Sequence, residues 1–238
     1  MTSSDTQIEV LENLEAAINY RKWCLSLALE VAGKRPFELG SGLGIYAEEI
    51  ISSEKFQVEA ITLSELDKNS LKILRRKFFG EPRVTIVDAA NIQYIGDQTH
   101  TSYISWNVLE HIEDDVAALE FSRRVCIPGG SIMMLVPAHQ HLYSRFDAKV
   151  GHFRRYSKKE LLLKANEAGL VDIRISHFNF AGYFFWLLKM KILRQSPEDH
   201  LALRILDRIV IPRLMQLERY VRPPFGQSLV LFARTPFE

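Results

Sequence analysis

Short apolar runs alternate along the chain with segments whose apolar residues recur at helical spacing. The expected strands are 37–39, 58–63, 84–87, 103–106, 132–136, 171–175 and 229–233. The expected helices between them are 45–51, 70–79, 114–126 and 158–168. Repeated strand–helix units with continuous apolar strands are typical of a parallel sheet covered by helices on both faces. The pattern therefore predicts a doubly wound α/β fold with a seven-stranded, mostly parallel sheet.

Two segments lie outside this alternation. Thr6 and Glu9 have the spacing of a capping box ahead of a helical pattern, so one or two helices are expected over 7–31. We interpret 1–33 as an N-terminal helical arm. Residues 178–222 interrupt the pattern before the last strand, as an apolar and helical insertion or lid. The whole chain, 1–238, is expected to form one domain with these two additions.

Composition narrows the class of protein only a little. A length of 238 residues suits one domain with a full core, and 47% apolar residues indicate a globular chain. The 30 basic and 29 acidic side chains nearly cancel, so no nucleic-acid partner is expected from bulk charge. Cys24 and Cys126 fit no metal or disulfide spacing and are expected to be buried thiols. Without a visible secretory signal, a cytoplasmic location is expected.

A glycine-rich loop follows the first strand, with the sequence Gly40-Ser41-Gly42-Leu43-Gly44. Glycines permit positive φ and close approach of the backbone to a ligand, and such loops bind nucleotides at the carboxyl ends of strands. The dinucleotide fingerprint needs its third glycine one residue later, where this chain has Ile45. Glu38 precedes the loop and suits a ligand that carries an ammonium group. These features favour S-adenosylmethionine (SAM) over a dinucleotide.

Acidic residues follow the next two strands at the same edge of the predicted sheet. Glu65 is expected to accept the ribose hydroxyls of the cofactor, with Asp67 as its rival, although Asp67 is better placed as a helix N-cap. Asp88 ends the third strand and could accept a hydrogen bond from the adenine amino group. A solvated strand-end carboxylate is the alternative for each acid taken alone.

With these residues in view, the sequence from about residue 19 to 233 resembles the class I SAM-dependent methyltransferases, which have a Rossmann-like fold. Residues 38–44 resemble motif I of that family, and Asp88-Ala89 resembles its adenine contact. Residues 106–112 are similar to the strand-four segment of the group with "LEH" there. The resemblance implies SAM as cofactor, and it implies further cofactor contacts at Leu66, Asn107 and Val108. Pro128-Gly129-Gly130 resembles the turn before strand five, with Ile127 in place of the usual lysine.

A narrower resemblance covers 136–157, where bacterial methyltransferases of types 11, 12 and 23 often have "VPAH" and "GHxRRY" sequences. Their setting in glycoconjugate and secondary metabolism implies no single acceptor. Tyr20 and Trp23 resemble a pairing that closes over the cofactor in such enzymes. Packing of an amphipathic helix into the core is the alternative for these two side chains.

Methyl transfer to an acceptor can need a general base, and the candidates follow strands four and five. His111 is the first candidate, because an unshifted histidine accepts a proton near neutral pH. His139, His152 and Tyr156 are the other predicted catalytic residues, while His141 and Asp147 lie in the same segment. Their spacing fits no metal-ligand motif, so no metal site is predicted. Structural roles for the histidines remain open.

Two further features bear on the acceptor. Arg154 and Arg155 could bind an anionic acceptor group, or else flank the next helix with one of them paired to Asp147. Residues 178–188 are aromatic and apolar, and Lys189, Lys191 and Arg194 follow. The stretch is shorter than the ~20 residues that span a bilayer. It could line an acceptor pocket, contact a second copy in a homo-oligomer, or let 178–194 contact a membrane surface.

The sequence therefore predicts a SAM-dependent methyltransferase that modifies oxygen, nitrogen or an activated carbon of a small-molecule acceptor, in biosynthesis such as secondary metabolism. One alternative is a methyltransferase for a lipid-linked or glycan acceptor at the membrane face. The other is a SAM-binding protein without turnover.

Overall fold

A computed structural model describes residues 16–192 and 204–238 of the chain. Its centre is a seven-stranded sheet in the order β3-β2-β1-β4-β5-β7-β6. The strands are β1 (Pro36–Leu39), β2 (Ile61–Glu65), β3 (Val84–Asp88), β4 (His100–Trp106), β5 (Cys126–Pro137), β6 (Val171–Phe178) and β7 (Ser228–Arg234). Neighbours from β3 to β5 pair in parallel, whereas β7 is antiparallel to both β5 and β6. The predicted α/β fold with a mostly parallel seven-stranded sheet is confirmed.

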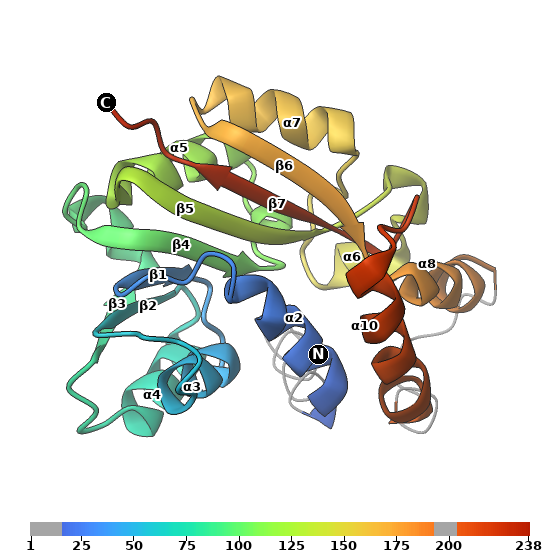
Figure 1. Cartoon of the computed structure of the whole chain (residues 1–238), viewed down its shortest axis with the longest axis horizontal. Coiled ribbons are helices and arrows are strands. Elements are labelled where there is room, and N and C mark those ends of the chain that lie inside the picture. Colours follow the sequence, from blue (N-terminus) through green and yellow to red (C-terminus); the bar gives the residue numbers. More distant parts are fainter. Residues whose placement is uncertain (1–15, 193–203) are drawn as a thin grey trace.

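Helices cover both faces of this sheet. The α-helices are α2 (Ile18–Ala28), α3 (Ile45–Ser52), α4 (Lys68–Lys77), α5 (Asp115–Val125), α6 (Arg145–Lys149), α7 (Lys158–Glu167), α8 (Phe180–Trp186) and α10 (Ile211–Tyr220). Short 3₁₀ segments are η1 (Ala89–Tyr94), η2 (Leu109–His111) and η3 (Gln140–Leu142), and π-helical segments are η4 (Leu187–Ile192) and η5 (Leu206–Val210). In Figure 1, α5 and α7 lie over one face, and α2, α3, α4 and α10 lie over the other.

The strand side chains divide between two cores, because successive residues of a strand point to opposite faces. In β5, Met133 and Leu135 join the core beneath α2, α3 and α10. Ile132, Met134 and Val136 join the core beneath α5 and α7. This division explains the continuous apolar runs of the sequence: a strand covered on both faces has no solvent-facing side to fill with polar residues.

Helix starts agree with the local sequence, because capping acts over three or four residues. Asp67 accepts a hydrogen bond from the Ser70 N–H at 2.8 Å, which confirms it as the N-cap of α4. Asp114 and Ser157 cap α5 and α7 in the same way. Each cap satisfies one of the backbone N–H groups that a helix leaves free at its start.

Several strand boundaries differ from the prediction: β4 begins at His100 and β6 ends at Phe178, and the starts of β2 and β5 also differ. β2 begins at Ile61 and not at residue 58, because the Glu59 and Ala60 N–H groups bind the Lys34 carbonyl and Ile61 is the first residue paired with β3. β5 begins at Cys126, ahead of the predicted turn. His100 pairs with Cys126 and Ser102 with Ser131, so 127–130 form a bulge inside the strand.

The helical arm and the insertion are described only in part. Thr6, Glu9 and residues 193–203 lie outside the described residues, while α2 packs against η5 and α10. Asp207 of η5 accepts hydrogen bonds from the Asn19 and Tyr20 N–H groups at 3.2 and 2.8 Å, so the insertion caps the arm. Cys24 and Cys126 are buried free thiols, as predicted. Within 16–192 and 204–238, every helix is too short or too polar to cross a membrane.

Candidate active site

The glycine-rich loop leaves β1 where three strands end side by side. Leu39 pairs with Ser64 of β2 and with Ser105 of β4. Gly40 has a φ of 67°, and a Cβ there would lie 2.5 Å from Val108 Cγ2. Gly44 has a φ of 71°, and a Cβ there would lie 2.7 Å from Leu74 Cδ2. The loop therefore requires glycine at both positions, for conformation and for close packing.

Glu38 is a buried carboxylate in front of this loop, with 1% of its surface exposed. Its Oε1 accepts a hydrogen bond from Trp106 Nε1 at 3.1 Å. Its Oε2 and the Ser41 Oγ are buried, and neither makes a hydrogen bond of good geometry within the described part of the chain. Burial raises the pKa of Glu38 to about 7, against the opposing effect of the nearby Ser41 hydroxyl and of the Trp106 donor. A buried carboxylate oxygen without a donor can receive a cationic or hydrogen-bonding ligand group.

The two predicted strand-end acids lie next to each other, because Glu65 of β2 pairs with Asp88 of β3. Glu65 Oε2 accepts the Gly42 N–H at 2.7 Å, and its Oε1 accepts the Leu66 and Asp67 N–H groups. Asp88 accepts the Ala90 N–H at 2.9 Å. Glu65 thus holds the glycine loop against the end of β2 and still has a free lone-pair direction for a ligand hydroxyl.

Aromatic side chains from α2 lie in the same core as the Glu38 partner Trp106. Trp23 packs on Phe178 with ring centroids 4.2 Å apart, and Tyr20 lies 6.2 Å from the same ring. Tyr46 stacks on Trp106 at 4.3 Å. Trp23 is buried and Tyr20 is half-buried, so most of the surface of both side chains is packed against the core.

Beyond β4 the chain turns sharply at Asn107, which has a φ of 52°. Val108 then packs over Gly40, and η2 carries Glu110 and His111. His111 and His152 form an edge-to-face pair with ring centroids 4.6 Å apart. Burial, followed by the charge of His152, lowers the pKa of His111 to about 4. The imidazole of His111 is therefore neutral at physiological pH.

A second histidine cluster lies at the carboxyl ends of β5 and β6. His139, at an unusual φ of 66°, stacks on His177 with centroids 5.1 Å apart and lies 5.4 Å from Tyr183. His139 Nε2 and His177 Nδ1 are buried without a hydrogen-bond partner among the described residues. Burial lowers the pKa of both side chains, that of His177 to about 4. Both rings are therefore neutral near pH 7 and can accept a proton.

The sequence did not point to His177, and it pointed to Tyr183 only as one residue of the aromatic stretch 178–188. His177 lies within a strand and belongs to no local motif, and only the pairing of β6 with β7 brings it beside β5. The Tyr183 hydroxyl forms a hydrogen bond of 3.1 Å with His141 Nε2. Tyr183 also belongs to an aromatic group that includes residues of α8. That group also contains Phe180 and Phe184 of the same helix, together with Phe225 from the segment between α10 and β7. It lies beyond the carboxyl ends of β5 and β6 (Figure 1).

Tyr156 and Arg155 are buried, and Arg154 is partly exposed. The Tyr156 hydroxyl donates to Asp115 at 2.9 Å, and none of the side chain is exposed. Arg154 pairs with Asp115 at 2.6 Å, and Arg155 pairs with Asp147 at 2.8 Å. Of the two interpretations of the arginines, the structure supports the one with an Asp147 ion pair.

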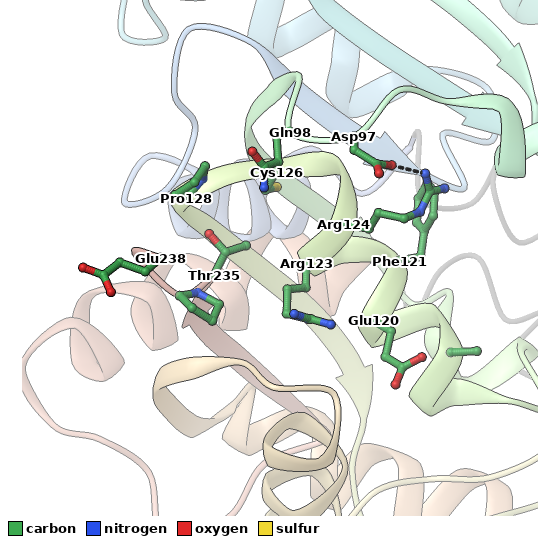
Figure 2. Close-up of a pocket in the computed structure, with 12 residues that line it drawn as sticks. Asp97, Gln98, Glu120, Phe121, Arg123, Arg124, Cys126, Pro128, Thr235 and Glu238 are labelled. Carbon is green, nitrogen blue, oxygen red and sulfur yellow. Dashed lines mark hydrogen bonds and ion pairs between the residues drawn. The ribbon is translucent and has the colours of Figure 1, made fainter.

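A pocket of about 480 Å³ lies at the opposite edge of the sheet (Figure 2). It is lined by Phe121 and Arg123 of α5, by Cys126 and Pro128 at the start of β5, and by the segment after β7. Arg124 forms an ion pair with Asp97 at its rim. This edge holds the amino ends of β4 and β5, so the pocket is separate from the glycine loop and its acids.

Comparison with known proteins agrees with this geometry. Residues 37–134 match the family model described as a methyltransferase domain. The comparison with curated proteins gave no match. Among solved structures, phosphoethanolamine N-methyltransferase 2 of Haemonchus contortus, solved with SAM, is 17% identical with a TM-score of 0.61. The match covers 87% of this chain but 49% of that protein, so the chain spans about half its length.

Two other similar structures are matched over most of their length. A putative sarcosine dimethylglycine methyltransferase from Galdieria sulphuraria is 16% identical, with a TM-score of 0.61 over 92% of this chain and 86% of the other. The putative methyltransferase from Haloferax volcanii, solved with the Trm112 activator, is 15% identical, with a TM-score of 0.64 over 98% and 96%. At such identities the likeness concerns the fold. The match to a methyltransferase domain concerns residues 37–134, and the similar structures share the fold of the whole sheet.

Proposed function

We propose that the chain is a SAM-dependent methyltransferase that modifies a small molecule at oxygen, nitrogen or an activated carbon, with the cofactor held at the carboxyl ends of β1, β2 and β3. The observation that carries the proposal is the buried Glu38 carboxylate with its unpartnered Oε2. Burying a carboxylate is costly unless a partner compensates it. The ammonium group of SAM supplies such a partner.

The other cofactor contacts follow the sheet edge. The glycine-rich loop would contact the methionine portion of SAM through Gly40, Ser41, Gly42 and Gly44. The ribose would be bound by Glu65 and Leu66. Asp88 and Ala89 would contact the adenine, whereas Asn107 and Val108 would close the site from β4. Tyr20 and Trp23 would cover it from α2. When bound, SAM supplies a methyl group activated by its sulfonium.

On the acceptor side we assign His139 as the general base. Its ring is neutral, and its Nε2 has no partner within the described residues. As the acceptor attacks the methyl carbon and the carbon–sulfur bond breaks, His139 Nε2 would take the proton that an acceptor O–H or N–H loses. His177 and Tyr183 would orient that ring and form a wall of the acceptor pocket. Tyr156 would position the loop that carries the histidines, because its hydroxyl binds Asp115.

A test uses the full chain, SAM and a panel of small amines, phenols and carboxylic acids, with S-adenosylhomocysteine as the measured product. We expect His139→Gln to lower kcat by ~10²–10⁴-fold while the Kd for SAM stays unchanged. His141→Gln is the matched control, because His141 is an exposed neighbour in the same loop. Equal loss of kcat in both variants would contradict His139 as the base.

One observation favours a second candidate, a lipid-linked or glycan acceptor at a membrane face. Large apolar side chains are exposed on the insertion, at Phe184, Leu188, Ile209, Leu217 and Tyr220. Exposed apolar patches of this kind mark interaction surfaces. Sedimentation with anionic liposomes, lost in Phe184→Ser, would support this candidate. SAM binding without product across all acceptors would instead indicate a binding protein without turnover.

A further inference from the structure

Glu110 is a second buried carboxylate, separate from the one beside the glycine loop. It has no exposed surface, and neither Oε1 nor Oε2 has a hydrogen-bond partner among the described residues. A buried carboxylate with both oxygens unused is rare, because the lost hydration is normally replaced by donors or by a cation. The described part of the chain therefore supplies no donor to the Glu110 carboxylate, which leaves room for a ligand such as a cation.

Two histidines face this carboxylate. One ligand atom from each of Glu110, His111 and His152 can be chosen so that all three lie within 4.8 Å of one another. His152 Nε2 lies 3.8 Å from Glu110 Oε1, which is too long for a hydrogen bond. Two ligands on a tetrahedral zinc ion with 2.0–2.1 Å bonds lie about 3.4 Å apart, so a small adjustment would allow coordination.

Hydrogen bonds to residues outside the cluster fix the positions of these side chains. His152 Nδ1 is bound to Asp147 Oδ1 at 2.9 Å, which leaves Nε2 free to face Glu110. The Phe153 N–H donates to the Glu110 carbonyl at 2.8 Å, and the Tyr143 hydroxyl donates to the His152 carbonyl at 2.7 Å. A carboxylate behind a metal-bound histidine is the usual support of such a ligand, because it fixes the ring orientation.

From this geometry we infer that Glu110, His111 and His152 bind a divalent transition-metal ion, with Zn²⁺ as the best fit. Two imidazoles and one carboxylate are a common ligand set of catalytic zinc sites, which keep a fourth position open. Asp147 is already paired with Arg155, so Glu110 is the carboxylate of this group that is left to coordinate an ion. This proposal departs from the expectation, drawn from sequence spacing, of no metal site.

The position of the site gives it a use in the proposed reaction. η2 follows directly on β4, the strand beside β1, so the open coordination position would lie at the cofactor edge of the sheet. A bound divalent ion lowers the pKa of a coordinated hydroxyl group and orients it. This use rests on the proposed function, whereas the metal site itself does not.

The test titrates ZnCl₂ into the full-length, untagged chain by calorimetry, without SAM or acceptor. We expect one Zn²⁺ per chain, and at least ~10-fold weaker binding in both Glu110→Gln and His152→Asn, because each removes a ligand. His141→Gln is the control and should bind Zn²⁺ as the wild type does, since His141 lies in the other histidine cluster. Circular dichroism and SAM affinity verify that each variant is folded.

Substitution with Co²⁺ gives a second measurement that does not depend on affinity. The visible absorption of bound Co²⁺ should change in Glu110→Gln and stay the same in His141→Gln. Unchanged Zn²⁺ binding in Glu110→Gln, or loss of binding in His141→Gln alone, would overturn the assignment. Because neither readout needs an acceptor, failure here would leave the proposed methyl transfer intact, and failure of SAM binding would leave the metal site intact.

Discussion

At the Glu38 carboxylate, burial and hydrogen bonding act in opposite directions. Burial raises its pKa to about 7, whereas the nearby Ser41 hydroxyl and the Trp106 donor favour the ionised form. An ammonium partner would favour that form further, so SAM would bind most tightly where Glu38 is ionised. Below its pKa the free protein must first lose a proton, and this cost grows as the pH falls.

We therefore expect the affinity for SAM to fall about tenfold between pH 8 and pH 6, as the linkage relation gives for a single group with a pKa near 7. Calorimetry across this pH range measures the effect. Glu38→Gln should bind SAM weakly and should lose the pH dependence. A wild-type affinity that stays constant from pH 8 to pH 6 would remove Glu38 from the ammonium site.

The neighbouring acids Glu65 and Asp67 are expected to have different roles, Glu65 in binding the ligand and Asp67 in capping a helix. Glu65→Ala should weaken SAM by about 10–100-fold, because hydrogen bonds to a charged group contribute ~1.5–3 kcal/mol each. Asp67→Ala should leave the Kd for SAM nearly unchanged and should lower the free energy of unfolding by about 1 kcal/mol through loss of the α4 cap. The reverse pattern in calorimetry and urea unfolding would exchange the two roles.

At the scale of elements, Asp115 joins three parts of one face. Its carboxylate accepts from Tyr156, Arg154 and Lys164, which connects α5 to α7 and to the segment between them. Burial alone would raise the pKa of Asp115, but these donors hold it below the usual value. The stability that Asp115 contributes is therefore present above the unfolded pKa of about 3.9 and is lost as the pH falls through the lower folded value.

Tyr156→Phe tests whether this tyrosine is structural. Removing its hydroxyl should lower the free energy of unfolding by about 1–2 kcal/mol, because one donor to a buried carboxylate is lost. The kcat should stay within about threefold, since the side chain is fully buried. Urea unfolding and the product assay measure the two effects. Normal stability with a hundredfold lower kcat would instead place Tyr156 in the reaction.

Element prediction succeeded where the controlling interactions are local. Helices that begin after the caps Asp67, Asp114 and Ser157 start within two residues of the predicted positions, because a cap binds an N–H group two or three residues ahead. The start of β2 and the bulge in β5 were missed. Both depend on a partner strand or a distant carbonyl, and the sequence of one segment does not show its partner.

For the whole molecule, ligand binding should appear as thermal stabilisation. SAM at 100 times its Kd stabilises the folded state by about 2.7 kcal/mol. For a chain of this size that corresponds to a rise in Tm of roughly 5–10 °C. NAD at the same concentration should cause no rise, and Glu38→Gln should show a smaller rise with SAM. A shift with NAD and none with SAM would contradict the cofactor assignment.

Local periodicity was enough to predict the order and type of the elements, the fold class and the sheet edge at which we place the cofactor. These follow from periodicity and from the rule that parallel strands end at a common edge, so Glu38, Glu65 and Asp88 could be placed together before any coordinates. The side at which we place the acceptor became visible in the folded chain. The tertiary structure placed β7 between β5 and β6, which brought His177 onto His139, and it turned His152 towards Glu110. These pairs are distant in sequence, and no local pattern encodes which distant side chains a shared core brings into contact.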